Sequence, residues 1–118
     1  IEINPNYAEA YYNRGVEKGD LEDYKGAIAD YTKAIEIDPN DAEAYYNRGI
    51  AKGDLEDYKG AIADYTKAIE IDPNDSDFYY NRGIVKYYSG DKSGACRDAR
   101  KAQELGYDAS KFINNECN

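Results

Sequence analysis

A block of thirty-four residues that recurs along the chain constrains the fold more than any other feature of the sequence. Residues 42–75 repeat residues 8–41 with two differences in 34 positions, Val16 against Ile50 and Glu17 against Ala51. Residues 76–109 form a third, diverged copy. Self-similarity at this period is typical of proteins that stack small structural units, so we expect a repeat array in which each unit packs against its neighbours.

Each copy contains two stretches with apolar residues three and four positions apart, separated by a polar turn. In the second copy, the first stretch begins at Ala42, and the second covers residues 58–71 before an Asp-Pro-Asn-Asp stop signal at 72–75. This spacing predicts two antiparallel helices per copy, each with one buried face. In the first copy, the expected helices are 8–18 and 24–37.

The repeated block resembles the tetratricopeptide repeat (TPR), a helix pair of 34 residues with small and aromatic residues at fixed positions. The positions that carry the resemblance in the second copy are Tyr45, Gly49, Ala61, Tyr65, Ala68 and Pro73. The block departs from the family pattern at Arg48, where Leu is usual, at Lys52, where Tyr is usual, and at Gly53, since the family has its Gly three residues later, at Glu56. The first copy departs in the same way at Arg14, Lys18, Gly19 and Glu22.

The resemblance implies an all-α fold, an α-solenoid of antiparallel helix pairs that forms a TPR superhelix. The single domain, residues 1–118, then divides into repeats 8–41, 42–75 and 76–109 with a capping helix at 108–118. Residues 1–7 match the tail of a repeat, and we expect them to be the remnant of a preceding one. The expected total is seven helices, two per repeat and one cap, without strands.

The net charge of the chain indicates which partners to exclude. Asp and Glu number 24 against 15 Lys and Arg, which gives a formal charge of −9. Such a charge repels phosphate backbones and anionic lipid surfaces, so neither nucleic acid nor a membrane is an expected partner. No apolar run approaches the roughly 20 residues of a membrane span.

The sequence holds no recognisable catalytic or metal-binding motif. There is no His, which removes the usual general base and the usual zinc ligand. The acidic clusters at 20–23 and 54–57 lack the spacing of a calcium loop, and we interpret them as solvated charge and helix caps, with Asp20 and Asp23 placed to cap the helix at 24–37. We therefore expect no enzymatic activity, no cofactor and no metal.

Cys96 and Cys117 allow two interpretations. They lie near the start of the third repeat's second helix and the end of the capping helix, and antiparallel packing of these helices places them at one level. A disulfide there would stabilise the fold by about 3 kcal/mol. The alternative is two small buried thiols, which is what a reducing cytosol would leave. If both cysteines are reduced, we expect a cytoplasmic location. The sequence leaves both open.

The resemblance places the candidate binding site on the first helices, which line the concave face of TPR arrays. Residues at recurring positions of each repeat share one side of these helices, and the groove that they form is expected to be acidic and aromatic. The candidates are Glu9, Tyr12, Asn13, Val16 and Asp20 in the first repeat; Glu43, Tyr46, Asn47, Ile50 and Asp54 in the second; and Asp77, Tyr80, Asn81, Ile84, Tyr87 and Tyr88 in the third.

One Asn per repeat recurs in this set, as Asn13, Asn47 and Asn81. An Asn amide can pair with both the C=O and the N–H of an extended peptide, and the ladder resembles the one that peptide-binding TPR superhelices use. The alternative is that each Asn bonds to the neighbouring helix and fixes the packing of the repeats. The Arg that follows each Asn is expected to reach an acidic neighbour.

Two function hypotheses follow. The first is a non-catalytic protein-interaction scaffold that binds an extended peptide, basic or aromatic, along the concave groove. The second is an engineered or structural repeat module with no specific ligand, because near-identical copies arise either by recent duplication or by design. The clamp that holds chaperone tails in some TPR proteins is not expected, since it needs a Lys and an Asn where Tyr12 and Val16 stand.

The amino-terminal end of the array is expected to self-associate. Ile1 and Ile3 belong to the incomplete preceding repeat, which leaves the apolar face of the first helix, including Tyr11, without a complete cover. We therefore expect a weak homodimer through this end, opposed by the charge of −9 and strengthened by salt.

Overall fold

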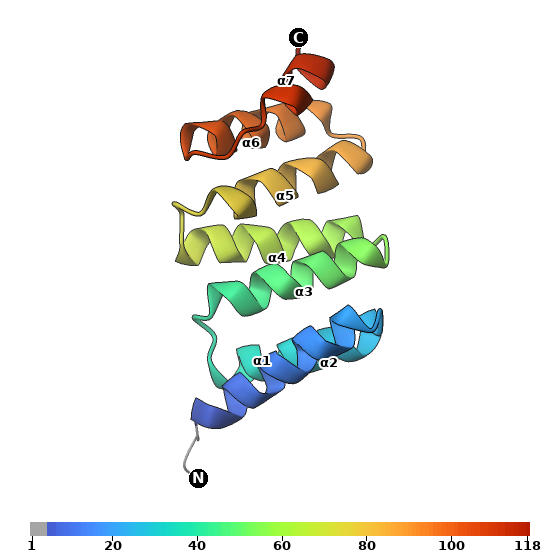
Figure 1. Ribbon diagram of the computed structural model, residues 1–118, viewed down its shortest axis with the longest axis vertical. Coiled ribbons are helices and arrows are strands. Elements are labelled where there is room, and N and C mark those ends of the chain that lie inside the picture. Colours follow the sequence, from blue (N-terminus) through green and yellow to red (C-terminus); the bar gives the residue numbers. More distant parts are fainter. Residues whose placement is uncertain (1–4) are drawn as a thin grey trace.

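The computed structural model describes residues 5–118, and these residues form seven helices and no strand. The helices are α1 (Pro5–Asp20), α2 (Tyr24–Ile37), α3 (Ala42–Asp54), α4 (Tyr58–Ile71), α5 (Ser76–Tyr88), α6 (Lys92–Glu104) and α7 (Ser110–Glu116). They stack as antiparallel pairs along one axis, with α7 against α6, in an elongated array of 54 × 26 × 20 Å (Figure 1). The prediction of an all-α solenoid with seven helices is confirmed.

The second helices begin at the predicted residues because each has the same cap. The carboxylate of Asp23 accepts a hydrogen bond from the backbone N–H of Gly26, at 3.0 Å, and Asp57 and Asp91 cap α4 and α6 in the same way. The residue that donates is Gly in each case, because a Cβ there would overlap the capping carboxylate. Asp20, the other predicted cap, is instead the last residue of α1.

The first helices run two residues beyond the predicted end, because the chain reverses later than the position of Gly19 and Gly53 suggested. α1 and α3 continue through both glycines, and the reversal depends on Glu22 and Glu56 in the left-handed region, at φ 62° and 63°. In the third repeat Gly90 takes this position, at φ 98°. A side chain in this region costs roughly 1–2 kcal/mol, so the departure from the family pattern leaves local strain in two turns.

The start of α1 also differs from the expectation. Residues 5–7, assigned from the repeat alignment to a preceding repeat, form the first turn of α1. Tyr7 stands where Asp41 and Asp75 cap α3 and α5, so nothing at Tyr7 ends the helix, and Pro5 suits a first helical turn. The expectations for Ile1 and Ile3 lie outside the described residues.

The core of the first and of the second repeat is an Ala and a Tyr from the second helix under aromatic and aliphatic residues of the first, and in the third repeat Ala99 replaces the Tyr. Ala61 and Tyr65 are buried, with Tyr46 and Ile50 packed against them, and Val85 of the next repeat completes the cluster. The Tyr65 ring lies against Gly49, where a Cβ would stand 2.9 Å from the ring. Only glycine permits this close approach, so the core explains the small residues of the repeat pattern.

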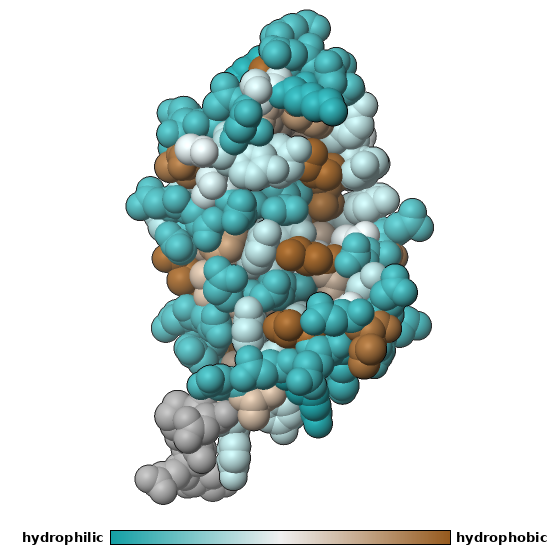
Figure 2. All heavy atoms as spheres, in the orientation of Figure 1, coloured by the Kyte–Doolittle hydropathy of each residue, from teal (hydrophilic) through white to brown (hydrophobic). Residues whose placement is uncertain are grey.

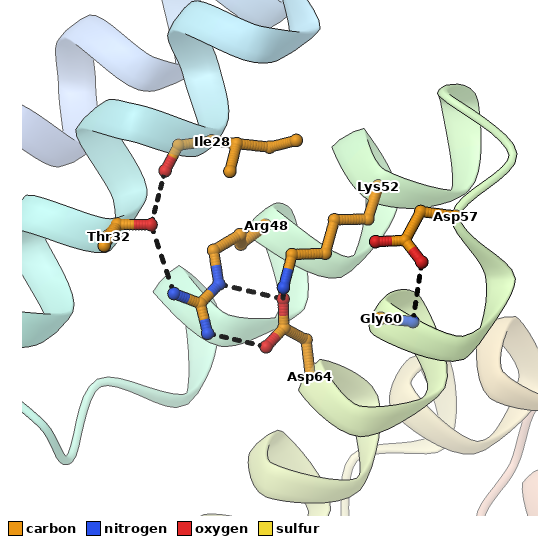
Figure 3. Close-up of polar contacts among 7 residues, drawn as sticks. All are labelled: Ile28, Thr32, Arg48, Lys52, Asp57, Gly60 and Asp64. Atoms are coloured by element: carbon orange, nitrogen blue, oxygen red, sulfur yellow. Dashed lines mark hydrogen bonds and ion pairs between the residues drawn. The ribbon is translucent and has the colours of Figure 1, made fainter.

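A polar cluster beside the core of the second repeat links three helices (Figure 3). Arg48 on α3 donates from Nε and Nη2 to the two carboxylate oxygens of Asp64 on α4, at 2.9 and 2.7 Å. The Nζ of Lys52 lies 3.2 Å from the same carboxylate. The third nitrogen, Nη1 of Arg48, donates to Thr32 on α2, in the preceding repeat, at 3.2 Å. Two of the departures from the family pattern, Arg48 and Lys52, therefore contact one buried carboxylate.

The cluster recurs in the other two repeats. The equivalent groups are Arg14, Lys18 and Asp30 in the first repeat and Arg82, Lys86 and Asp98 in the third, where Arg82 also donates to Thr66. The prediction that each Arg reaches an acidic neighbour is confirmed.

The guanidinium of Arg14 holds the pKa of Asp30 below its usual value. The stability from Asp30 is therefore complete above a pH of about 4 and is lost as the pH falls through the lowered pKa.

The array ends in α7, which continues the repeat. Its sequence Ser-Lys-Phe-Ile-Asn-Asn aligns at the 34-residue spacing with Ser-Asp-Phe-Tyr-Tyr-Asn at the start of α5, so the cap is the beginning of a fourth first helix. A disulfide and a side-chain hydrogen bond are among the contacts that hold its far end. A disulfide joins Cys96 on α6 to Cys117, with Cα atoms 5.7 Å apart, and the Tyr87 hydroxyl donates to Oε1 of Glu116 at 2.6 Å.

The strained turns predict a stabilising substitution. Changing Glu56 to Gly should raise the free energy of unfolding by about 0.5–1 kcal/mol, because relief of the left-handed conformation exceeds the added freedom of the unfolded chain. Gly90→Ala should lower it at the equivalent turn. Urea unfolding of the two variants measures both, and a Glu56→Gly protein less stable than the wild type would contradict the account of the turn.

The near-identical first and second repeats allow a matched test of the polar cluster. Asp64→Asn should destabilise the fold by about 3 kcal/mol, because it leaves Arg48 and Lys52 charged in a largely dry setting. Asp30→Asn should cost less, since the side chain of Arg14 is 57% exposed against 17% for Arg48 and can turn to water. Equal losses in urea unfolding would show that burial of the cation does not decide the cost.

The outer side of α1 is open among the described residues. Tyr7 is 61% exposed, and a shallow hollow lies beside it between Ala10, Tyr11 and Arg14. The weak homodimer expected at this end stays a prediction. Light scattering should show association that rises with protein concentration and with salt, and a strict monomer at high salt and high concentration would count against it.

Candidate functional site

Three hollows follow one another along the first-helix side of the array. The first lies between α1 and α3, the second between α3 and α5, and the third between α5 and α7, with volumes of about 180, 260 and 320 Å³. In Figure 2, hydrophobic patches recur along the long axis between hydrophilic residues on the face turned to the viewer. The first two hollows are smaller than a typical small-molecule site, and each of the three has room for a side chain or two.

The hollows share walls because the same repeat positions line them. Ile50 and Asp54 line both the first hollow and the second, and Ile84 and Tyr88 line both the second and the third. The three hollows therefore form one continuous groove with an aliphatic residue, a polar residue and an Asn in each period.

Most of the candidate residues lie in this groove. Those that line it are Val16, Asp20, Asn47, Ile50, Asp54, Tyr80, Asn81, Ile84, Tyr87 and Tyr88. Those that do not are Glu9, Tyr12, Asn13, Glu43, Tyr46 and Asp77. Tyr24 and Tyr58 also line the groove, and the sequence analysis missed them because they belong to the second helices. Their place directly after the capping Asp is the signal that could have found them.

Tyr12 and Tyr46 are absent from the groove because they join the repeats. The Tyr12 ring packs on Tyr31, with centroids 5.8 Å apart, and its hydroxyl accepts a hydrogen bond from Nδ2 of Asn47 at 2.6 Å. Asn81 donates to the Tyr46 hydroxyl in the same way, at 2.9 Å. Burial raises the pKa of Tyr46 to about 12, so its hydroxyl keeps its proton at any ordinary pH.

These contacts bear on the open question about the Asn ladder. The amide nitrogens of Asn47 and Asn81 bond to the preceding repeat, which is the packing alternative. Their Oδ1 atoms take no part in these bonds, and both residues line the groove, so each still offers an acceptor there. Asn13 is exposed on α1 and lines none of the three hollows.

The groove is electrically negative. Asp20 and Asp54 line its first half, and burial raises the pKa of Asp54, helped by the charge of Glu22. Near the other end of α3, burial raises the pKa of Glu43, and the charges of Asp75 and Asp41 add to this. Burial is the larger cause of both shifts, and the neighbouring carboxylates add negative charge, so a cation would be favoured beside Asp54.

Neither a metal site nor a membrane-crossing helix is present in the described part of the chain. Residues 5–118 contain no group of three or more His, Cys, Asp or Glu arranged to hold a metal ion. No helix in that range is both long and apolar enough to span a bilayer.

Three family models match the sequence. A TPR repeat model matches residues 16–55, a tetratricopeptide repeat model matches 42–75, and a further tetratricopeptide repeat model matches 64–103. A search of curated proteins finds no match.

Solved structures of the same fold are numerous. The first TPR of Spaghetti (RPAP3), bound to the HSP90 peptide SRMEEVD, has a TM-score of 0.92 at 22% identity, covering 99% of this chain and 95% of that chain. The Arabidopsis OM64 TPR domain has a TM-score of 0.89 at 26% identity, covering 94% and 93%. The TPR2B domain of yeast Sti1, in a complex with pHsp70, has a TM-score of 0.81 at 30% identity, covering 92% and 84%.

The sequence matches and the geometry agree. The matched segments together run from residue 16 to residue 103, and the described helices pair and stack as three repeats and a cap. The chain belongs to the tetratricopeptide repeat family.

Proposed function

We propose that the chain is a non-catalytic protein-interaction scaffold that binds an extended peptide along the groove. The observation that carries this proposal is the row of three hollows at repeat spacing, with walls shared between neighbours. A periodic groove suits a periodic ligand, and an extended peptide presents its side chains at regular intervals. The free Oδ1 acceptors of Asn47 and Asn81 suit the backbone N–H groups of such a peptide.

The charge of the groove favours a basic or aromatic peptide. Asp20 and Asp54 lie in the hollows, and the whole chain carries a formal charge of −9. Complementary charge accelerates encounter and rejects anionic competitors more than it adds affinity. The aliphatic and tyrosine surfaces between the carboxylates supply the apolar contact.

The similar structures support peptide binding but point to a different ligand. The Spaghetti domain is described with an HSP90 peptide, and the Sti1 domain in a complex with pHsp70. The peptide SRMEEVD is acidic, whereas the groove here is itself acidic. Tyr12 and Val16 stand where the chaperone-tail clamp needs Lys and Asn, and the Tyr12 hydroxyl is already bonded to Asn47. A chaperone tail is therefore not the proposed ligand.

The competing proposal is a structural or engineered repeat module with no specific ligand. It is favoured by the 32 identical positions among the 34 that the first two repeats share. Near-identity also repeats the groove chemistry, so it does not by itself separate the two proposals. Binding measurements do.

A peptide array followed by fluorescence anisotropy tests the scaffold. Extended basic or aromatic peptides should bind, the acidic peptide SRMEEVD should not, and affinity for basic peptides should fall with salt. The double change Asp20→Asn and Asp54→Asn should weaken binding of a basic peptide by roughly three- to tenfold, since two rim charges are lost. Burial raises the pKa of Asp54, so this carboxylate loses its charge at a higher pH than an ordinary Asp does. As the pH is lowered, binding of a basic peptide should therefore begin to weaken before the usual pKa of Asp is reached.

The matched control removes two carboxylates from the second helices. Glu36→Gln with Glu70→Gln makes the same change in net charge at exposed positions on α2 and α4, outside the three hollows, and should leave binding unchanged. An equal loss of peptide affinity in the two double variants would show that only the net charge of the chain matters. Failure of every peptide to bind would favour the module without a ligand.

A further inference from the structure

The third hollow differs from the other two in its chemistry. The first helices of repeats 1 and 2 end in Gly-Asp, at Gly19-Asp20 and Gly53-Asp54, whereas α5 ends in Tyr87-Tyr88. The third hollow is also the most spacious of the three, at about 320 Å³. The repeat at the carboxyl-terminal end has therefore exchanged a small and an acidic residue for two aromatic rings at the groove.

Aromatic residues are four of the eight that line this hollow. It is lined by Tyr80, Tyr87 and Tyr88 from α5 and by Phe112 from α7. The Tyr87 ring meets Tyr88 edge-on at a centroid distance of 5.9 Å and meets Phe112 edge-on at 5.6 Å. Rings at right angles present both edges and faces to the space between them. Tyr88 remains 66% exposed, so its ring is available to a ligand.

A carboxylate stands in the same wall. Glu116, at the end of α7, lines the hollow, and its Oε1 accepts the hydrogen bond from Tyr87. That bond fixes the carboxylate and leaves its other oxygen as an acceptor. Lys111 also lines the hollow, but it lies at the start of α7, more than one helical turn from Glu116. The negative charge is thus at one end of the wall and the positive charge at the other.

We propose that the third hollow is an anchor pocket for a cationic side chain, arginine or lysine, of the bound peptide. The negative face of an aromatic ring attracts a cation, and tyrosine rings beside a fixed carboxylate combine that attraction with an ion pair. This inference rests on the proposed function and names the residue class that the peptide needs at the carboxyl-terminal end of the groove. The first hollow has Tyr24 and Tyr31, and the second has Tyr58, Tyr65 and Tyr88, but Tyr31 and Tyr65 are buried in the core. The carboxylate that a tyrosine hydroxyl fixes, Glu116, belongs to the third hollow.

The anchor can be tested with small probes on the whole chain. N-acetyl-arginine amide and N-acetyl-lysine amide should shift the backbone NMR signals of residues around the third hollow. N-acetyl-citrulline amide, which has the shape of the arginine probe without its charge, should not. Shifts confined to other hollows, or equal binding of the citrulline probe, would overturn the proposal.

Variants of the lining residues give the sharper comparison. Tyr88→Leu should weaken binding of the arginine probe about two- to fivefold through loss of the cation–π contact. Glu116→Gln should also weaken it, and Lys111→Gln should strengthen it. The control is Tyr7→Leu, the same change at a 61% exposed tyrosine at the other end of the array, which should have no effect. A Tyr88→Leu protein that binds as the wild type does would overturn the anchor.

A second measurement separates this inference from the scaffold proposal. Peptides that bind equally well with arginine or citrulline at every position would leave the scaffold standing and overturn the anchor. Binding of the arginine probe in the third hollow without binding of any peptide would support the pocket and overturn the scaffold.

Discussion

One buried carboxylate per repeat determines how the helices of this array are held. Asp64 is 3% exposed, yet it faces Arg48 and Lys52, and Arg48 also reaches Thr32 in the preceding repeat. A buried ion pair adds little net stability, because both charges lose their water. Its geometric demand is large, since two nitrogens of a planar guanidinium must face two oxygens. The pairing therefore fixes the register of α3 against α4 and of both against α2.

The groove exists because the first helices divide their surface between packing and exposure. Tyr46 lies in the interface with the next repeat, where it packs on Phe78 at a centroid distance of 4.9 Å and accepts from Asn81. Ile50, one turn further along α3, is left between two hollows. A shift of one residue in the helix register would turn both side chains away from these places by about 100°. The polar pairing that fixes the register thus also decides which residues face a ligand.

Local signals predicted some parts of the structure well. The ranges 24–37 and 58–71 agree with α2 and α4 because an Asp cap and a Gly three residues later define each start. The start of α1 was not predicted, since the alignment carried the repeat back across Tyr7, where the cap is missing. The left-handed turn at Glu56 could be inferred only as a departure from the family pattern.

The lining of the groove was predicted less completely than the fold, for a physical reason. Periodicity along one helix identifies a shared side, and Val16, Ile50 and Ile84, chosen in this way, line the hollows. It does not say how much of that side the neighbouring repeat covers. Tyr12 is covered, whereas Tyr24 is exposed to the groove, because the angle between adjacent repeats is a tertiary property. The hydrogen bond from Asn47 to Tyr12 joins residues 35 apart in the sequence, so it is also a tertiary property that periodicity along one helix does not predict.

The contacts that cross each boundary between repeats have a consequence for recognition. Arg48 and Asn47 both reach back to the first repeat, and Arg82 and Asn81 reach back to the second, so each boundary is fixed at two points. Two fixed points prevent one repeat from rotating on the next, and the hollows therefore keep a constant separation. The array therefore presents its hollows at a fixed interval. A ligand that fills two hollows is selected by the interval between its side chains as well as by their chemistry.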